Sequence, residues 1–132
     1  MTPKSLARIE IVGDFMKKLG AFDFEGAGKH LADNAKMVLP YFEAMPPLDG
    51  KAAMLKQMKA TMTQMFERME FIFDAWYPVE GQDALVAEYH SVCPRLGNAG
   101  TYENSYITLY RFEGDKITLY KEYLNPTKLN FA

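Results

Sequence analysis

The spacing of apolar residues divides the chain into a mainly helical first half and an alternating second half. Over residues 5–19, apolar side chains recur every three or four positions and Gly20 follows the last of them, which predicts an amphipathic helix. A shorter helix is predicted over residues 23–31, with Asp23 as its N-cap. A third helix is predicted over residues 51–66, where methionines form much of the apolar stripe.

The segment between the second and third helices carries turn and strand signals. Ala-Asp-Asn at residues 32–34 predicts a turn, and residues 36–42 then have the pattern of a strand. Residues 45–50 contain two prolines, which fix the backbone and remove hydrogen-bond donors. We therefore expect a loop that leads into the third helix.

From residue 69 onward the apolar period changes from 3.6 residues to 2, which is typical of strands. Strands are predicted over residues 69–76, 84–92, 101–112 and 116–124. Polar segments separate them, at residues 80–83, 94–100 and 113–115. Helices set apart from an antiparallel run of strands indicate an α+β architecture. The sequence shows no repeat and no second domain, so residues 1–132 are interpreted as one domain.

Composition and charge narrow the classes of partner. The length of 132 residues fits one domain, and 48% hydrophobic residues suffice for one sizeable core. Charged residues make up 24% and the formal net charge is -2, which argues against a nucleic-acid partner. No window approaches the roughly 18 consecutive apolar residues of a membrane helix, so no membrane association is expected. Glu10 and Asp14 interrupt the apolar N-terminal pattern, which predicts a helix and not a signal peptide.

Cysteine and histidine are too few to suggest a disulfide or a metal centre. Cys93 is the single cysteine, which excludes an internal disulfide, and the chain has two histidines. We therefore expect a reducing cytoplasm and no metal. Cys93 precedes Pro94 at a strand end and is interpreted as unreactive, and His30 is interpreted as a surface residue of the second helix.

Methionine and tyrosine are concentrated in two stretches. Six of the nine methionines lie between Met45 and Met69, and six of the eight tyrosines lie between Tyr89 and Tyr123. Methionine adapts to irregular apolar space, and tyrosine combines an apolar body with one polar group. Both suit the wall of a ligand pocket, although a methionine-rich core with half-exposed tyrosines would give the same pattern.

The final predicted hairpin carries a recognisable motif. It consists of Arg111-Phe112, a Gly-Asp turn before Lys116-Ile117, and the ending Glu122-Tyr-Leu-Asn-Pro126. This hairpin resembles that of SnoaL-like (polyketide-cyclase-like) proteins in the nuclear transport factor 2 / ketosteroid isomerase superfamily. Leu31-Ala-Asp-Asn-Ala-Lys36 and the Pro-Pro-x-x-Gly before the third helix are also similar. The resemblance covers nearly the whole chain.

The resemblance implies a cone-shaped, cystatin-like fold, in which three N-terminal helices pack on a curved antiparallel sheet around one apolar pocket. It also implies a small apolar ligand, no cofactor, and a homodimer formed through the outer face of the sheet. This fold hosts many activities, so the function has to be argued from individual residues.

The residues that move protons in ketosteroid isomerase have no equivalents here. That enzyme uses an Asp base and an oxyanion hole made of a Tyr and a protonated Asp. In an ungapped comparison, Phe15 takes the place of the Tyr, Leu39 that of the base and Thr108 that of the oxyanion-hole Asp. Since Phe and Leu cannot transfer a proton, the chain is not expected to be a typical ketosteroid isomerase.

Other relatives direct attention to Glu122. Epoxide hydrolases of the superfamily hold a water between two Asp residues and an Arg, and Tyr120-Lys-Glu122 resembles the segment that carries one of those Asp residues. In phenazine-forming and polyketide-cyclase relatives, an acidic residue near this position acts as a general acid. The Arg-x-Asp pair of the hydrolases is absent as such, and its nearest counterpart here is Glu88-x-His90.

Strand alternation sorts the candidates by face. Glu122 shares a face of the last strand with Tyr120 and Leu124. By resemblance, the pocket face of the preceding strand carries Tyr102, Asn104, Tyr106, Thr108 and Tyr110. Glu88 and His90 share one face of the strand over residues 84–92, but a single bulge would exchange its two faces, so its inward face stays open.

If Glu88 and His90 face inward with Glu122, the site suits general acid–base chemistry such as hydrolysis, isomerisation or cyclisation. The candidate catalytic residues are then Glu122 as acid, with His90 and Glu88 as base or water-holding partners. The candidate substrate-binding residues are Tyr106, Asn104, Tyr102, Thr108, Tyr120, Leu124, Phe15, Leu39, Met54 and Met58.

Three functional hypotheses remain at this point. The first is a cofactor-independent acid–base enzyme on an apolar cyclic substrate, with Glu122 as acid. The second is a non-catalytic binding module for an apolar metabolite, in which Glu122 only accepts hydrogen bonds from tyrosines. The third is a dimerising adaptor without a cavity, its interior filled by Met54, Met58 and Met62.

Overall fold

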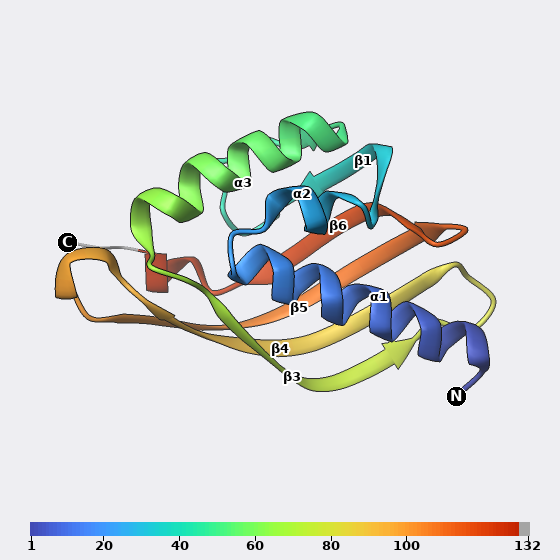
Figure 1. Ribbon diagram of the computed structural model, residues 1–132. Helices are drawn as coiled ribbons and strands as arrows, with labels where there is room; N and C mark the ends of the chain where they lie inside the picture. Colours follow the sequence, from blue (N-terminus) through green and yellow to red (C-terminus); the bar gives the residue numbers. More distant parts are fainter. Residues whose placement is uncertain (130–132) are drawn as a thin grey trace.

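The structure is a computed structural model that describes residues 1–129, and it has the expected α+β architecture (Figure 1). The helices are α1 (Pro3–Gly20), α2 (Phe24–Gly28) and α3 (Lys51–Met65). The strands are β1 (Leu31–Val38), β2 (Leu48–Asp49), β3 (Glu70–Pro78), β4 (Ala84–Pro94), β5 (Thr101–Glu113) and β6 (Lys116–Leu124). Two short 3₁₀ turns follow β4 and β6, η1 (Leu96–Asn98) and η2 (Pro126–Leu129).

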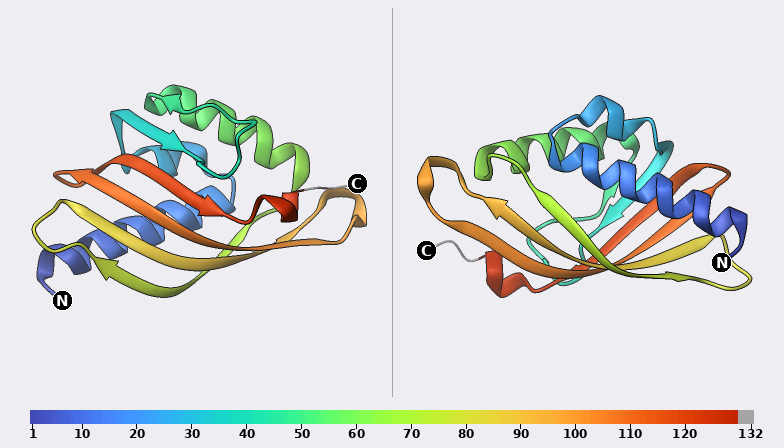
Figure 2. Two further views of the ribbon diagram at one scale, coloured as in Figure 1. Left: turned by 180° about the vertical axis from the view of Figure 1, so that it is seen from behind. Right: turned by 60° about the horizontal axis from the view of Figure 1, so that its bottom comes forward.

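The strands form one curved sheet in the order β2-β1-β6-β5-β4-β3. β1 runs parallel to β6, and every other neighbouring pair is antiparallel. Over the described residues, the three helices lie on one face of this sheet and leave the opposite face uncovered (Figure 2). The core therefore lies between the helices and the concave inner face of the sheet, where the buried apolar side chains gather.

Helix α1 begins and ends close to the predicted bounds. Thr2 caps it by accepting a hydrogen bond from the Ser5 amide at 3.1 Å, and Pro3 occupies the first turn, where a missing N–H costs nothing. Its apolar stripe buries Val12, Phe15, Met16 and Leu19 against the sheet. The spacing of these residues, three or four apart, explains why the sequence pattern located this helix well.

The end of α1 is fixed to the start of β3 by a close backbone approach. The Met69 amide donates to the Gly20 carbonyl at 3.0 Å. A Cβ atom on Gly20 would lie 2.0 Å from the Met69 carbonyl oxygen, which is far inside van der Waals contact. Glycine is therefore required at this position for steric reasons.

The region around α2 and β1 differs from the sequence-based prediction. The helix predicted over residues 23–31 ends at Gly28, and the turn predicted over residues 32–34 lies inside β1. The pairing of β1 with β6 is irregular between Leu31 and Lys36, and the polar residues that suggested a turn sit at this irregularity. Tertiary pairing with β6 therefore overrides the local turn signal.

The strand predicted over residues 36–42 is displaced toward the N-terminus and ends at Val38. Pro40 follows two residues later and cannot donate to a β ladder, which explains why the strand does not continue. Part of the predicted loop also forms regular structure, because the two-residue strand β2 pairs Asp49 with Lys36 and Leu48 with Met37.

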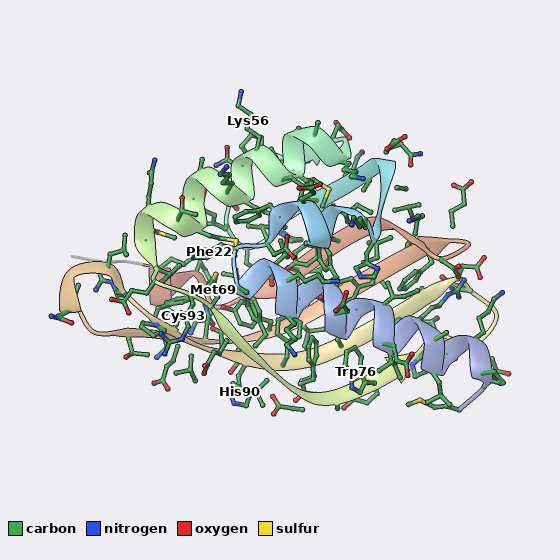
Figure 3. All side chains as sticks on the ribbon, in the orientation of Figure 1. Phe22, Lys56, Met69, Trp76, His90 and Cys93 are labelled. Atoms are coloured by element: carbon green, nitrogen blue, oxygen red, sulfur yellow. The ribbon has the colours of Figure 1, made fainter. Side chains whose placement is uncertain are left out.

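Helix α3 packs over β1 and β2. Met54 and Met58 are buried on its inner side, and Lys56 projects outward from the opposite side (Figure 3). Within residues 1–129, no helix is both long enough and apolar enough to cross a membrane.

Candidate functional site

The register between β4 and β5 decides which side chains of β4 enter the core. Tyr89 is paired with Tyr106, and Glu88 with Ile107. Directly opposed residues on antiparallel strands share a face. Since Tyr106 is buried and Ile107 is half exposed, Tyr89 faces the core and Glu88 faces outward.

Glu88 and His90 therefore lie on the outer face of the sheet, away from the helices. Glu88 accepts a hydrogen bond from the Tyr77 hydroxyl at 3.2 Å, and His90 Nδ1 lies 2.8 Å from Asp74 Oδ2. Figure 3 shows His90 projecting away from the core. The structure does not bring this pair to Glu122, so the two residues are not part of the candidate site.

A cavity of about 210 Å³ lies between α3 and the inner face of the sheet. Six methionines line it, namely Met37, Met45, Met58, Met62, Met65 and Met69. Among residues 1–129, six aromatic residues complete most of the wall, namely Phe42, Phe66, Phe71, Tyr102, Tyr106 and Tyr120. Gln57 and Thr61 of α3 also border the cavity, are partly exposed, and hydrogen-bond to each other at 2.9 Å.

Glu122 is the acidic residue in the lining of this cavity, and its side chain is almost fully buried. One of its oxygens, Oε1, accepts hydrogen bonds from Tyr89 at 2.7 Å and from Tyr120 at 2.6 Å. Thr108 Oγ1 lies 2.7 Å from the Tyr89 hydroxyl, which places Thr108 behind the first pair. The other oxygen, Oε2, accepts no hydrogen bond from any group within residues 1–129.

Burial raises the pKa of Glu122 above the 4.5 of a free glutamate side chain, because few groups are present to stabilise the charged form. The hydrogen bonds from Tyr120 and Tyr89 act in the opposite direction but do not outweigh this desolvation. A carboxyl with a raised pKa keeps its proton closer to neutral pH and can donate it to a bound molecule.

A second polar network supports the tyrosines of β5. The Tyr106 hydroxyl lies 2.7 Å from Ser91 Oγ, and the Tyr102 hydroxyl accepts from Asn104 Nδ2 at 2.6 Å. Asn104 also donates to the Asn125 carbonyl at 3.0 Å, which ties the end of β6 to β5. Asn104 is therefore a structural residue behind the cavity wall.

The other residues predicted to bind substrate divide into two groups. Those that line the cavity are Tyr102, Tyr106, Tyr120, Leu124, Leu39 and Met58. Phe15, Met54 and Thr108 are buried behind the wall. Phe15 supports the site indirectly, since its ring packs edge-on against Tyr120 with the centroids 6.1 Å apart.

Tyr89 is a residue of the candidate site that the sequence pattern did not identify. It is fully buried, binds Glu122, and stacks on Tyr106 with ring centroids 4.9 Å apart. The available signal was the contrast between the two faces of β4. The inward face carries one polar residue, Ser91, beside Leu85, Ala87, Tyr89 and Cys93, whereas the outward face carries both Glu88 and His90.

The Cys93 thiol packs behind the cavity-lining residues Phe66 and Tyr102 and does not itself line the cavity. Burial raises the pKa of the Cys93 thiol to about 11, which leaves it protonated and unreactive at neutral pH. Over the described part of the chain, no three His, Cys, Asp or Glu side chains cluster in a way that could hold a metal ion.

Comparison with known proteins adds family membership to this geometry. The profile of the family described as the SnoaL-like domain matches residues 12–120. A comparison with curated protein sequences found no significant match.

Solved structures with the same fold include proteins with different assigned activities. A Bacillus subtilis protein provisionally named an isomerase has a TM-score of 0.86 and 22% identity, covering 96% of this chain and 92% of that chain. An LEH-like epoxide hydrolase from M. tuberculosis has a TM-score of 0.78 and 13% identity, with coverages of 96% and 88%. A Xanthomonas campestris protein provisionally named a polyketide cyclase has a TM-score of 0.80 and 16% identity, with both coverages 96%.

At these identities the structural likenesses concern the fold alone. The family profile, in contrast, spans α1 from Val12 to the middle of β6 at Tyr120, and it therefore includes most of the elements that build the cavity. The hairpin resemblance in the sequence, the cone-shaped architecture and this profile all agree. The chain belongs to the SnoaL-like domain family.

Proposed function

We propose that this protein binds a small apolar molecule in the cavity between α3 and the sheet, and that Glu122 acts on it as a general acid in a cofactor-independent cyclase, isomerase or hydrolase reaction. The observation that carries the proposal is the position of Glu122, a buried carboxyl in a mostly apolar wall with one oxygen held by two tyrosines. The raised pKa of Glu122 suits a proton donor.

The proposed step moves one proton and returns it. The proton passes from Glu122 Oε2 to an oxygen of the ligand as the electron pair of a C=O or C–O bond moves onto that oxygen. A water molecule or an enol carbon of the ligand adds to the electron-poor carbon. The proton that this nucleophile loses returns to Glu122, whose transient negative charge is stabilised by the Tyr89 and Tyr120 hydroxyls.

The test is turnover of a panel of compact epoxides, lactones and enolisable diketones, followed by mass spectrometry. We expect turnover of at least one compound, and a loss of about 100-fold or more in Glu122→Gln, since general acid catalysis contributes typically 10²–10⁴-fold. Glu103→Gln, an exposed carboxylate on β5, is the matched control and should retain the rate. Full activity in Glu122→Gln would rule out the acid role.

A specific observation also favours the second candidate, a non-catalytic binding module. The partner groups that two-residue acid–base chemistry would need, Glu88 and His90, lie on the outer face of the sheet. Among the described cavity residues, Glu122 is thus the one side chain that titrates at a lower pH than the tyrosines. Tight retention of a ligand through purification, without turnover of any panel compound, would support this candidate over the enzyme.

We further propose that the protein forms a homodimer through the outer sheet face and resides in the cytoplasm. Three large apolar side chains, Ile72, Tyr77 and Ile107, are exposed on the uncovered strands β3 and β5. Ile107→Glu should shift the mass measured by light scattering from dimer to monomer, and a native monomer would contradict the proposal.

The buried, protonated Cys93 needs no oxidising compartment, which supports the proposed cytoplasmic location. Cell fractionation tests this location.

A further inference from the structure

The hydrogen bonds of the cavity wall determine which polar groups remain available to a ligand. The Tyr120 proton is committed to Glu122, and the Tyr106 hydroxyl is bonded to Ser91. The Tyr102 hydroxyl accepts hydrogen bonds from Asn104 and from Tyr106. Gln57 and Thr61 bond to each other where the cavity approaches solvent. Within the described lining, the deep polar atom that keeps unused hydrogen-bonding capacity is therefore Glu122 Oε2.

The geometry also fixes which oxygen of Glu122 carries the proton when the carboxyl is neutral. A carboxyl oxygen has two lone pairs, and both lone pairs of Oε1 are occupied by the Tyr89 and Tyr120 protons. The acidic proton then has to be on Oε2. Among the described side chains, Tyr110 Oη is the one polar atom that is both fully covered and without a hydrogen-bond partner. Oε2 of Glu122 also accepts no hydrogen bond, so it cannot be fully covered and retains contact with open volume. That volume is the cavity, because Glu122 lines it.

The cavity volume limits the size of the ligand. An apolar cavity of about 150 Å³ is known to hold benzene. The cavity here is about 210 Å³, which is moderately larger and falls below the roughly 300 Å³ at which pockets for drug-sized ligands begin. One or two fused rings fit this space, whereas a four-ring skeleton does not. Methionine side chains adapt to ligands of slightly different shape.

We propose that the cavity selects a compact, uncharged ligand of one or two rings that carries a carbonyl or ether oxygen, and that this oxygen accepts the hydrogen bond from Glu122 Oε2. This inference rests on the proposed binding role, but it does not require catalysis. Ligands with a carboxylate are rejected because their charge would face a buried carboxyl without a cation nearby. Ligands with an ammonium group require the costly burial of two charges in an apolar cavity.

Of the described titratable groups at the site, Glu122 is the one whose ionisation is relevant to binding. The titratable side chains that face it are Tyr89 from β4, Tyr102, Tyr106 and Tyr110 from β5, and Tyr120 from β6. All five tyrosines have pKa values raised above 10.0, chiefly by burial, so they stay neutral throughout the useful range. Within residues 1–129, no cationic side chain forms an ion pair with Glu122. The affinity for an acceptor ligand should fall as rising pH ionises Glu122.

Four probes on one bicyclic frame test the inference by calorimetric titration at about pH 5.5, where amines are cationic and most free carboxyls are ionised. They are indane, 1-indanone, 1-aminoindane and 1-indanecarboxylate. We expect 1-indanone to bind at least tenfold more tightly than indane, and the two charged probes to bind more weakly than indane. Equal binding of indane and 1-indanone, or tightest binding of 1-aminoindane, would overturn the inference while leaving the binding role intact. No binding of any probe to folded protein would overturn both.

Two variants of Glu122 separate hydrogen bonding from proton transfer. In Glu122→Gln the amide N–H₂ takes the place of the Oε2 proton donor, so the preference for 1-indanone should persist and lose its pH dependence. In Glu122→Leu the preference over indane should disappear. Loss of the preference in a folded Glu122→Gln protein, or its persistence in Glu122→Leu, would contradict the proposal. Glu103→Gln serves as the control for unrelated charge effects and should bind like the unmodified protein.

Discussion

The Tyr89 hydroxyl donates to Glu122 Oε1 at 2.7 Å, although strand β5 separates the two strands that carry these residues. Thr108 lies opposite Glu122 on β5, and its small side chain leaves room for the tyrosine to reach across. Thr108 also lies within hydrogen-bond distance of the same hydroxyl. Three strands are thus joined by one polar network on the inner face of the sheet, directly beneath the cavity.

This relationship predicts different effects for two similar substitutions. Tyr89→Phe removes the bonds to Glu122 and Thr108 and should lower the free energy of unfolding by about 1–3 kcal/mol. Tyr110→Phe removes a buried hydroxyl that has no hydrogen-bond partner among the described residues. This substitution should change the free energy of unfolding by less than about 0.5 kcal/mol. Urea denaturation of both variants provides the comparison. Equal losses would mean that the Tyr89 bonds contribute nothing specific.

Glu122 predicts a pH dependence of stability with a definite sign. Its pKa is raised in the folded protein, so the native state retains a proton that the unfolded chain releases near pH 4.5. The contribution of Glu122 is therefore fully present below about pH 4.5 and is lost as pH rises through the native pKa. Glu122→Gln lacks this titration. Relative to the unmodified protein, the variant should gain stability as pH rises over this window, and a constant or falling difference would contradict the burial of a neutral carboxyl.

For Asp14 we expect a pH dependence of stability with the opposite sign. Lys18 Nζ and His30 Nε2 each lie 2.6 Å from Asp14 Oδ2, and these contacts lower the pKa of Asp14 below 3.8. The stabilisation is present above the unfolded pKa and is lost as pH falls through the native pKa. Because the pair is partly exposed, Asp14→Asn should cost at most about 1 kcal/mol near neutral pH, with no cost at strongly acidic pH. Chemical denaturation at several pH values measures this cost, and a cost that increases toward acid pH would refute the assignment.

Substitution of glycine by alanine should change the stability of the protein in opposite directions at two positions of α1. Gly13 has no atom within 4 Å of the position of an added Cβ, so Gly13→Ala should stabilise the helix by about 0.5–1 kcal/mol. At Gly20 an added Cβ would lie 2.0 Å from the Met69 carbonyl oxygen, and Gly20→Ala should destabilise the protein by about 1–3 kcal/mol. Thermal unfolding of both variants tests the pair. A tolerated Gly20→Ala would show that the contact between α1 and β3 differs from the one described.

The elements that were predicted well are those whose pattern is set by one buried face. Helix α1 and strands β5 and β6 each bury a regular set of side chains, so the periodicity located them within a few residues. The boundary between α2 and β1 could not be located in this way. Leu31 begins a strand because it pairs with Ile117 of β6, a contact 86 positions away in the sequence that no local pattern reveals.

The candidate site was also predictable from the sequence in part. Glu122 and the cavity-facing tyrosines Tyr102, Tyr106 and Tyr120 follow from alternation on β5 and β6 together with the family resemblance. The inward face of β4 was not predictable, because it depends on the pairing of Tyr89 with Tyr106 across a connection whose length fixes no register. That single register assigns Tyr89 to the site and places His90 outside it.

We propose that Glu122 is a buried acid whose proton is directed into the cavity. The most direct measurement is a pH titration of the Glu122 carboxyl carbon by NMR, in the ligand-free protein and with 1-indanone. We expect a midpoint above 4.5 without ligand and a further increase when the ketone binds, because the ligand stabilises the neutral form. A midpoint at or below 4.5, unchanged by the ketone, would contradict it.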